Sequence, residues 1–253
     1  MTLEKPAAAY FDKWYADMAA SPARDAIIAR ALGLPPDHQV TGILTWPGVA
    51  ELAEELRLPV DGLLLDIACG RGGYGIEVAR RAGARLVGVD FSPVVVEHAR
   101  LAGAAWLPAG RAEFQVGTLL AAGLPTGVAD GLMCVDAVQF GEPPLAALLE
   151  FRRLLSSGGR LALTCWEAVD PSDGRVPPRI RAVDLARDLP QAGFVDVEVH
   201  DRPQWREAER AVWQAAVAAA DPDAAVRSLQ EEGRRSLEQF DSLRRVFATA
   251  TAP

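Results

Sequence analysis

A run of mostly apolar residues from Gly62 to Cys69 leads directly into a glycine-rich turn, Gly70-Arg71-Gly72-Gly73-Tyr74-Gly75. Such a run is typical of a strand in a parallel sheet, which is buried on both faces. Helical periodicity begins at Tyr74, immediately after the turn. Because parallel strands are joined by crossover connections, this segment predicts a parallel sheet with helices on both of its faces.

The alternation of strand and helix patterns continues along the chain and predicts an α/β fold, a Rossmann-like doubly wound sheet. One helix start is marked by Ser92, a good N-cap residue, followed by Pro93 at the first helical position. The predicted strands are Gly62–Cys69, Arg85–Asp90, Ala112–Gly117, Ala129–Asp136, Gly159–Glu167, Val195–Asp201 and Arg244–Ala252, and the predicted helices between them are Tyr74–Ala84, Pro93–Ala104, Leu145–Leu155 and Arg179–Ala192.

Two segments lie outside this alternation. Residues 1–60 predict an N-terminal helical lid ahead of the main domain, residues 61–253. Within that domain, residues 204–243 predict two helices, split at Asp221-Pro222, before the last strand. Ligands of parallel sheets bind at the carboxyl ends of the strands. We therefore expect the inserted helices to form a short cap over that end.

The amino-acid composition indicates which kinds of substrate are disfavoured and in which cellular compartment the protein is expected. The 253 residues carry 26 Lys and Arg against 34 Asp and Glu, a net charge of -8, which disfavours a nucleic-acid substrate. Three cysteines cannot all pair with one another and lack the spacing of a metal site. We expect a cytoplasmic protein without signal peptide, membrane span or metal, and the Ala- and Arg-rich composition suggests a bacterial source.

The glycine turn and an acidic residue on the next strand predict a nucleoside site. Gly70 and Gly72 leave room for a ligand to approach the main chain, and Asp90 ends the second strand, where it can accept hydrogen bonds from two ribose hydroxyls. The turn also satisfies the dinucleotide pattern G-x-G-x-x-G. Asp66 inside the first strand favours a methyl donor instead, since a carboxylate there can reach the amino group of a methionine moiety.

Several motifs resemble those of the class I S-adenosylmethionine-dependent methyltransferases. They are Leu65–Gly72, Gly88–Ser92 and Leu154–Leu161. The resemblance implies a seven-stranded sheet whose last strand is antiparallel, with the donor S-adenosyl-L-methionine lying across the first, second and fourth strand ends. It also implies that Asp66, Gly70 and Gly72 hold the methionine half.

By the same resemblance Asp90 holds the ribose and Phe91 packs on the adenine. The chain departs from the family at Ala68, where glycine is common, and at Gly117-Thr118-Leu119, where an Asp often binds the adenine amino group. Adenine recognition is therefore assigned to the Thr118 hydroxyl or to main chain. The predicted donor-binding residues are Asp66, Ala68, Gly70, Gly72, Asp90, Phe91, Thr118, Leu119 and Val135.

The candidate catalytic residues for methyl transfer lie in two places. One is just after the fourth predicted strand, and the other is near the end of the sixth. Asp136 and Gln139 are expected at the mouth of the pocket, where Asp136 acts as a base, binds the donor amino group, or caps a helix. His200 near the end of the sixth strand is a second candidate base, against the alternative of a solvated histidine. A positioned base accelerates such a step about 10²–10⁴-fold.

Aromatic residues predict the acceptor site. Tyr10 and Trp14 lie on one face of the N-terminal helix and are candidate lid residues, and Trp46 could close the same mouth. For each of these residues simple packing is the alternative. The predicted acceptor-binding residues are Tyr10, Trp14, Trp46, Gln139, Phe140, Trp166, Trp205 and Trp213.

The sequence thus predicts an S-adenosylmethionine-dependent methyltransferase that acts on a small aromatic or apolar molecule, and the resemblance and composition suggest a role in secondary metabolism. Transfer is an in-line displacement from the sulfonium, and the acceptor atom, O, N or C, stays open. The alternatives are an NAD(P)-dependent oxidoreductase and a relative of the same fold that does not methylate. We expect no nucleic-acid or membrane partner, and a monomer or homodimer.

Overall fold

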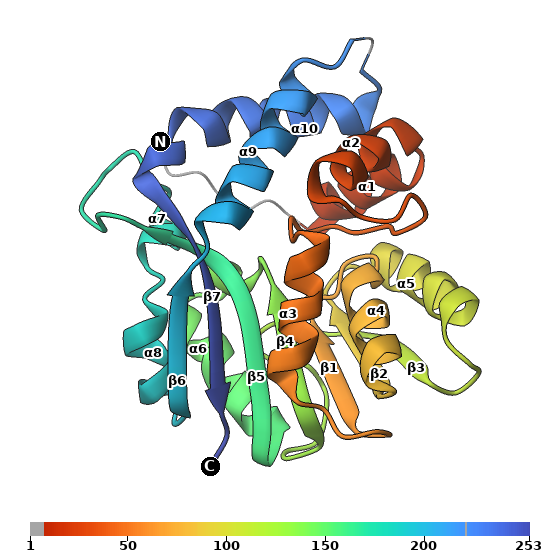
Figure 1. The fold of residues 1–253 in the computed structure, drawn as a ribbon, viewed down its shortest axis with the longest axis vertical. Coiled ribbons are helices and arrows are strands. Elements are labelled where there is room, and N and C mark those ends of the chain that lie inside the picture. The colour runs from red at the N-terminus through yellow and green to blue at the C-terminus, as the bar shows by residue number, and fades with distance from the viewer. Residues whose placement is uncertain (1–7, 221) are drawn as a thin grey trace.

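The structure is a computed structural model that describes residues 8–220 and 222–253. Its centre is a seven-stranded sheet with the order β3-β2-β1-β4-β5-β7-β6 (Figure 1). The first five strands along the chain pair in parallel, and β7 runs antiparallel to both neighbours, as predicted. The strands are β1 (Leu63–Ile67), β2 (Arg85–Asp90), β3 (Ala112–Val116), β4 (Ala129–Val135), β5 (Leu155–Ala168), β6 (Val195–Asp201) and β7 (Leu243–Thr251).

Helices cover both faces of the sheet and its carboxyl end. One apolar core lies under α3, α4 and α5, and a second lies under α6 and α8 on the opposite face. At the carboxyl end α1 and α2 lie beside α9 and α10 (Figure 1). The helices are α1 (Ala8–Ala19), α2 (Pro22–Leu32), α3 (Trp46–Leu56), α4 (Gly73–Ala82), α5 (Pro93–Trp106), α6 (Pro144–Leu154), α7 (Pro178–Arg181), α8 (Leu185–Gln191), α9 (Pro203–Val217) and α10 (Ala224–Glu238), with short 3-10 turns at Val138–Phe140 and Phe240–Ser242.

Local sequence signals explain most of these boundaries. The Ser92 side chain accepts a hydrogen bond from the Val95 N–H at the start of α5. The predicted single helix 179–192 is instead two helices, because Asp184 caps α8 by accepting from the Arg187 N–H and so starts a new helix. The predicted split of the cap is confirmed, since α10 starts anew after Asp223, which accepts from the Val226 N–H.

The N-terminal segment divides into two parts with different positions. Helix α3 packs on the face of the sheet, where Val49, Leu52 and Leu56 are buried in the first core. Of the described residues that precede β1, only α1, α2 and the loop up to Leu44 lie over the carboxyl end of the sheet. The lid is therefore shorter than the predicted 1–60, whose first seven residues lie outside the described part. No helix in the described ranges is long and apolar enough to cross a membrane.

Candidate active site

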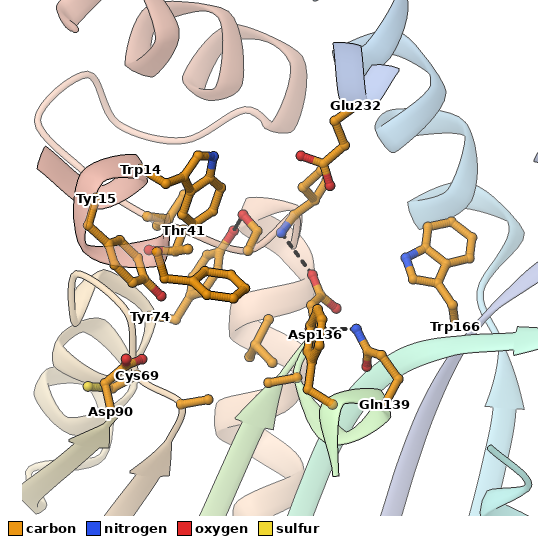
Figure 2. Close-up of a pocket in the computed structure, with 18 of the residues that line it drawn as sticks. Trp14, Tyr15, Thr41, Cys69, Tyr74, Asp90, Asp136, Gln139, Trp166 and Glu232 are labelled. Atoms are coloured by element: carbon orange, nitrogen blue, oxygen red, sulfur yellow. Dashed lines mark hydrogen bonds between the residues drawn. The ribbon is translucent and has the colours of Figure 1, made fainter. Parts of the chain in front are cut away.

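A cavity of about 650 Å³ lies between the carboxyl ends of the strands and the helices above them (Figure 2). Its floor is formed by the ends of β1, β2 and β4 and by the loops that follow β3 and β4. Its walls and roof come from α1, α2, α9 and α10. A volume of this size suits a small-molecule site, and the position is the usual one for doubly wound sheets.

Asp90 at the end of β2 forms part of the floor, as predicted. Its carboxylate accepts hydrogen bonds from the N–H groups of Gly70, at 2.9 Å, and Ser92, at 3.1 Å. A carboxylate has about four acceptor positions, so these donors leave Asp90 able to accept from a ligand as well. Burial raises the pKa of Asp90, while the backbone N–H donors oppose that rise. Phe91, next to it, lines the cavity and meets the edge of the Phe11 ring at 5.2 Å.

Asp66 lies inside β1 and also faces the cavity. It is 2% exposed, and burial together with the neighbouring charge of Asp90 raises its pKa to about 8. The Gly75 N–H donates to the Asp66 carboxylate and stabilises the charged form. A buried carboxylate with an elevated pKa is stabilised by an incoming cation. Asp66 therefore fits the ammonium group of a methionine moiety.

The two glycines predicted to hold the methionine half do not line the cavity, which is a correction. A side chain at Gly70 would collide with Thr41 of the lid, and one at Gly72 would meet Ala99 and Phe114 in the core at 3.2 Å each. Gly72 also has a φ of +82°, which favours glycine. Both glycines thus serve tight packing, and Gly73 is the turn residue that reaches the cavity.

The remaining predicted donor residues are at the cavity. Ala68 has a left-handed φ of +62° and lies beside Val135 of β4 on the floor. Thr118 and Leu119 follow β3, where the Thr118 hydroxyl accepts from the Ala121 N–H at 3.1 Å and retains its own proton as a donor. The residues present therefore fit an adenosyl sulfonium, with carboxylates for the ribose and the amino group and a hydroxyl for the adenine.

The loop between α2 and α3 closes one side of the cavity, which Thr41, Gly42 and Ile43 line. Its anchor is Tyr74, which is buried, accepts a hydrogen bond from the Leu44 N–H at 2.9 Å and donates to a carbonyl of the same loop. Arg71 of the glycine turn forms a bidentate pair with Asp25 of α2, at 2.8 and 3.0 Å. Trp46 points elsewhere, beneath the Arg81 guanidinium, and does not line the cavity.

Asp136 follows β4 and joins three parts of the structure. One carboxylate oxygen accepts from the Ile43 N–H of the lid at 2.8 Å, and the other accepts from the Thr164 hydroxyl at 2.7 Å and pairs with Arg245 of β7. Because both oxygens are engaged, Asp136 fixes the lid to the sheet and is poorly placed to serve as a base. Gln139 lies beside it, donates to the Asp136 carbonyl at 2.7 Å and lines the cavity (Figure 2).

Three further predicted residues lie away from the cavity. His200 is on β6 at the edge of the sheet, where its half-exposed ring pairs with Glu198 at 3.0 Å, so it is not a catalytic candidate. Trp205 is buried against Phe247 of β7 and has a packing role. Tyr10 is 53% exposed and does not line the cavity.

The other end of the cavity is aromatic, as predicted. Trp166 and Phe240 lie with ring centroids 6.3 Å apart, and Trp213 from α9 completes the wall. Trp14 and Phe140 also line the cavity, so both stay predicted contacts of the acceptor. This end offers apolar ring surface, which binds flat apolar molecules.

Several polar residues at this site were missed by the sequence analysis. Arg245 is fully buried and contacts Asp136, the Ile43 carbonyl at 3.0 Å and, at 3.8 Å, Glu209 of α9. Glu209 accepts from the Trp213 indole N–H, and burial raises its pKa to about 8. Glu232 of α10 also lines the cavity. The Glu209–Trp213 pair has the i,i+4 spacing of one helix face, which is the signal that could have revealed it.

Comparisons with known proteins agree with this geometry. A family model described as a methyltransferase domain matches residues 64–159. The O-methyltransferase cnsE of Penicillium expansum is 31% identical over 150 residues, 54% of this chain and 54% of that protein. Among solved structures, phosphoethanolamine N-methyltransferase 2 of Haemonchus contortus, in complex with S-adenosyl-L-methionine, has a TM-score of 0.72 and 17% identity, over 92% of this chain and 57% of that one.

A second structure, the [4+2]-cyclase SpnF, has a TM-score of 0.70 and 21% identity over 98% of this chain and 97% of that one. At these identities the structural likeness concerns the fold alone. Residues 64–159 therefore form a methyltransferase domain, and the residues of the cavity fit S-adenosyl-L-methionine as the methyl donor. The chain spans little more than half the length of the P. expansum and H. contortus proteins.

Proposed function

We propose that this protein transfers a methyl group from S-adenosyl-L-methionine to a hydroxyl oxygen of a small, largely aromatic molecule. The observation that carries the proposal is the single cavity, which joins a donor end at Asp66 and Asp90 to an aromatic end at Trp166 and Phe240. The O-methyltransferase name of the P. expansum relative supports oxygen as the acceptor atom.

The sulfonium already activates the methyl carbon, so the chain's own residues mainly align donor and acceptor and exclude water. Holding two reactants in line contributes of order 7–11 kcal/mol in favourable cases. Here the lid contributes to alignment and closure, since Tyr74, Asp136 and Arg245 tie it to the sheet beside the cavity. The rings at the acceptor end supply a flat apolar surface for the acceptor.

Titration calorimetry and product analysis test the proposal in sequence. The protein should bind S-adenosylhomocysteine and show no measurable heat with NAD. A panel of phenols and matched anilines should then be incubated with the donor and examined by mass spectrometry. The expected result is a mass increase of one methyl group on phenols. Methylation of the anilines alone would move the proposal from oxygen to nitrogen.

A second candidate is a rearrangement of an unsaturated substrate without methyl transfer. The resemblance to the cyclase SpnF, which extends over nearly the full length of both chains, supports this second candidate function. The same mass spectra separate the two functions, because a cyclised product has the mass of its substrate and a changed retention time. Formation of such a product without consumption of donor would replace methyl transfer as the function.

The cellular setting is part of the proposal and rests on composition. We propose a bacterial cytoplasmic enzyme of secondary metabolism that acts as a monomer or homodimer and not on nucleic acid. Its cysteines, Cys69, Cys134 and Cys165, are buried free thiols, which suits a reducing compartment. The net charge of -8 disfavours a polyanionic substrate.

A further inference from the structure

Glu232 occupies an unusual position on α10. Ala225, Leu229, Glu232 and Ser236 follow one another at spacings of four, three and four residues, so they share a helix face, and all four line the cavity. Glu232 is thus an acidic residue on the face that the helix turns toward the site. Figure 2 shows its side chain reaching from α10 into the space above Asp136.

The carboxylate of Glu232 differs from the other carboxylates at the cavity because it has no hydrogen-bond or ion-pair partner among the described residues. Within residues 8–220 and 222–253 no hydrogen bond or ion pair engages it, whereas Asp66, Asp90, Asp136 and Glu209 each accept at least one hydrogen bond. Glu209 lines the same cavity, but its free oxygen has almost no accessible surface and lies 3.8 Å from the Arg245 guanidinium. Glu232, by contrast, is only partly buried and remains open to a molecule in the cavity.

Charged groups from several elements face Glu232. Arg24 of α2, Arg179 of α7 and Arg235 of α10 lower the pKa of Glu232, and Glu209 of α9 is a like charge. Burial outweighs the arginines, so the pKa of Glu232 is raised above its ordinary value. Arg24 is itself occupied by Asp25 and by the Val40 carbonyl of the lid, at 3.0 and 3.2 Å, and is not free to neutralise Glu232.

We propose that Glu232 is the general base of the reaction and binds the hydroxyl of the acceptor. The inference rests on the proposed function and adds the residue that takes the proton. As the bond between the acceptor oxygen and the methyl carbon forms, the bond from that carbon to sulfur breaks and its electron pair stays on sulfur. The hydroxyl proton passes to a Glu232 oxygen and is later lost to water.

The decisive experiment compares Glu232→Gln with Glu231→Gln, a matched change at an exposed neighbour on the same helix. With an ordinary phenol, kcat of Glu232→Gln should fall about 100-fold, within the range a general base supplies. With a nitrophenol that is already ionised at the assay pH, the loss should be less than about fivefold, because no proton remains to be removed. Glu231→Gln should match the wild type within twofold for both.

The pH profile adds a readout that a structural role would not move. In the wild type kcat/KM for the ordinary phenol should rise with pH as Glu232 ionises, and this rise should be absent in Glu232→Gln. Equal losses with ionised and ordinary phenols, or an unchanged pH profile, would overturn the assignment. The affinity for S-adenosylhomocysteine should stay within twofold, which separates loss of the base from loss of the donor site.

A binding measurement separates failure of this inference from failure of the proposed function. Glu232→Gln removes a negative charge, so it should bind the nitrophenolate at least threefold more tightly than the wild type does. If no phenol is methylated by the wild type, the proposed function fails, yet this difference still places Glu232 against the oxygen of a bound nitrophenolate. If the nitrophenolate affinities are equal, Glu232 does not face the acceptor and the inference falls.

Discussion

The donor end and the acceptor end of the cavity are built differently. At the donor end, Asp66 and Asp90 lie within a stretch of 25 residues, and their carboxylates are held by the N–H groups of Gly75, Gly70 and Ser92. At the acceptor end, Trp166, Trp213, Glu232 and Phe240 come from separate elements, and side chains rather than main chain form the wall.

These two kinds of construction explain how one fold can keep its donor and change its acceptor. A site made by main-chain N–H groups at strand ends depends on the sheet itself and tolerates little change. A site made by side chains of α9 and α10 can be altered one residue at a time. The buried Arg245 stands between the two, because it contacts Asp136 on the strand side and Glu209 on the helical side.

Removing the Arg245 contacts to Asp136 and Glu209 should have the largest effect on stability. Arg245→Met leaves the buried carboxylates of Asp136 and Glu209 without their cation and should lower the free energy of unfolding by about 3–5 kcal/mol. Urea denaturation followed by circular dichroism measures the change. As a control, Lys13→Met removes an exposed pair with Asp17 and should cost less than about 0.5 kcal/mol. Equal losses would mean that Arg245 does not connect the two ends.

Asp66 allows the donor end to be tested by pH. Its pKa is about 8 in the folded protein against an ordinary 3.8, so between these values the folded state binds more protons than the unfolded state. Its contribution to stability therefore falls as pH rises through that window and is constant above it. Asp66→Asn should remove the fall and be about 2–4 kcal/mol more stable than wild type at pH 8. An identical dependence of Tm on pH in both proteins would contradict the assignment.

Asp90 should matter more for donor affinity than Asp136. Asp90→Asn replaces the carboxylate that we expect to accept from two ribose hydroxyls, and it should weaken S-adenosylhomocysteine binding about 30-fold, or about 2 kcal/mol. Asp136→Asn changes a carboxylate already occupied by Ile43, Thr164 and Arg245 and should weaken binding less than about threefold. Titration calorimetry measures both. Similar losses would mean that Asp136 also holds the donor.

The smallest effect is expected at the acceptor wall. Trp166→Leu removes ring surface from the cavity and should raise the KM for a phenol about fivefold while donor affinity is unchanged, since part of a buried aromatic contact is worth about 1 kcal/mol. Trp106→Leu, at a half-exposed tryptophan on α5 outside the cavity, is the matched control and should leave both values unchanged. An equal change in donor affinity would show that the two ends are not separable.

The strand and helix patterns predicted the seven strands and the cap, and the family resemblance implied the antiparallel last strand and a donor site with Asp66, Asp90 and Val135, all three of which line the cavity. These features are local, because apolar periodicity, glycine turns and strand ends are properties of neighbouring residues. The prediction that His200 is a catalytic base was wrong, because local patterns do not give the order of the strands in the sheet. The pattern places it near a strand end, but only the strand order shows that β6 is at the edge of the sheet.

Short motifs with a fixed local conformation were enough to predict the parallel sheet, the nucleoside end of the site and, through the family they resemble, the class of chemistry. The remaining features arise only when distant elements pack together in the folded protein. This packing brought Arg245 from the last strand to Asp136 and turned Glu232 toward the cavity, and it made Gly70 a contact of the lid residue Thr41. Such pairings depend on how distant elements pack, and a periodic pattern within one element carries no information about which partner it will meet.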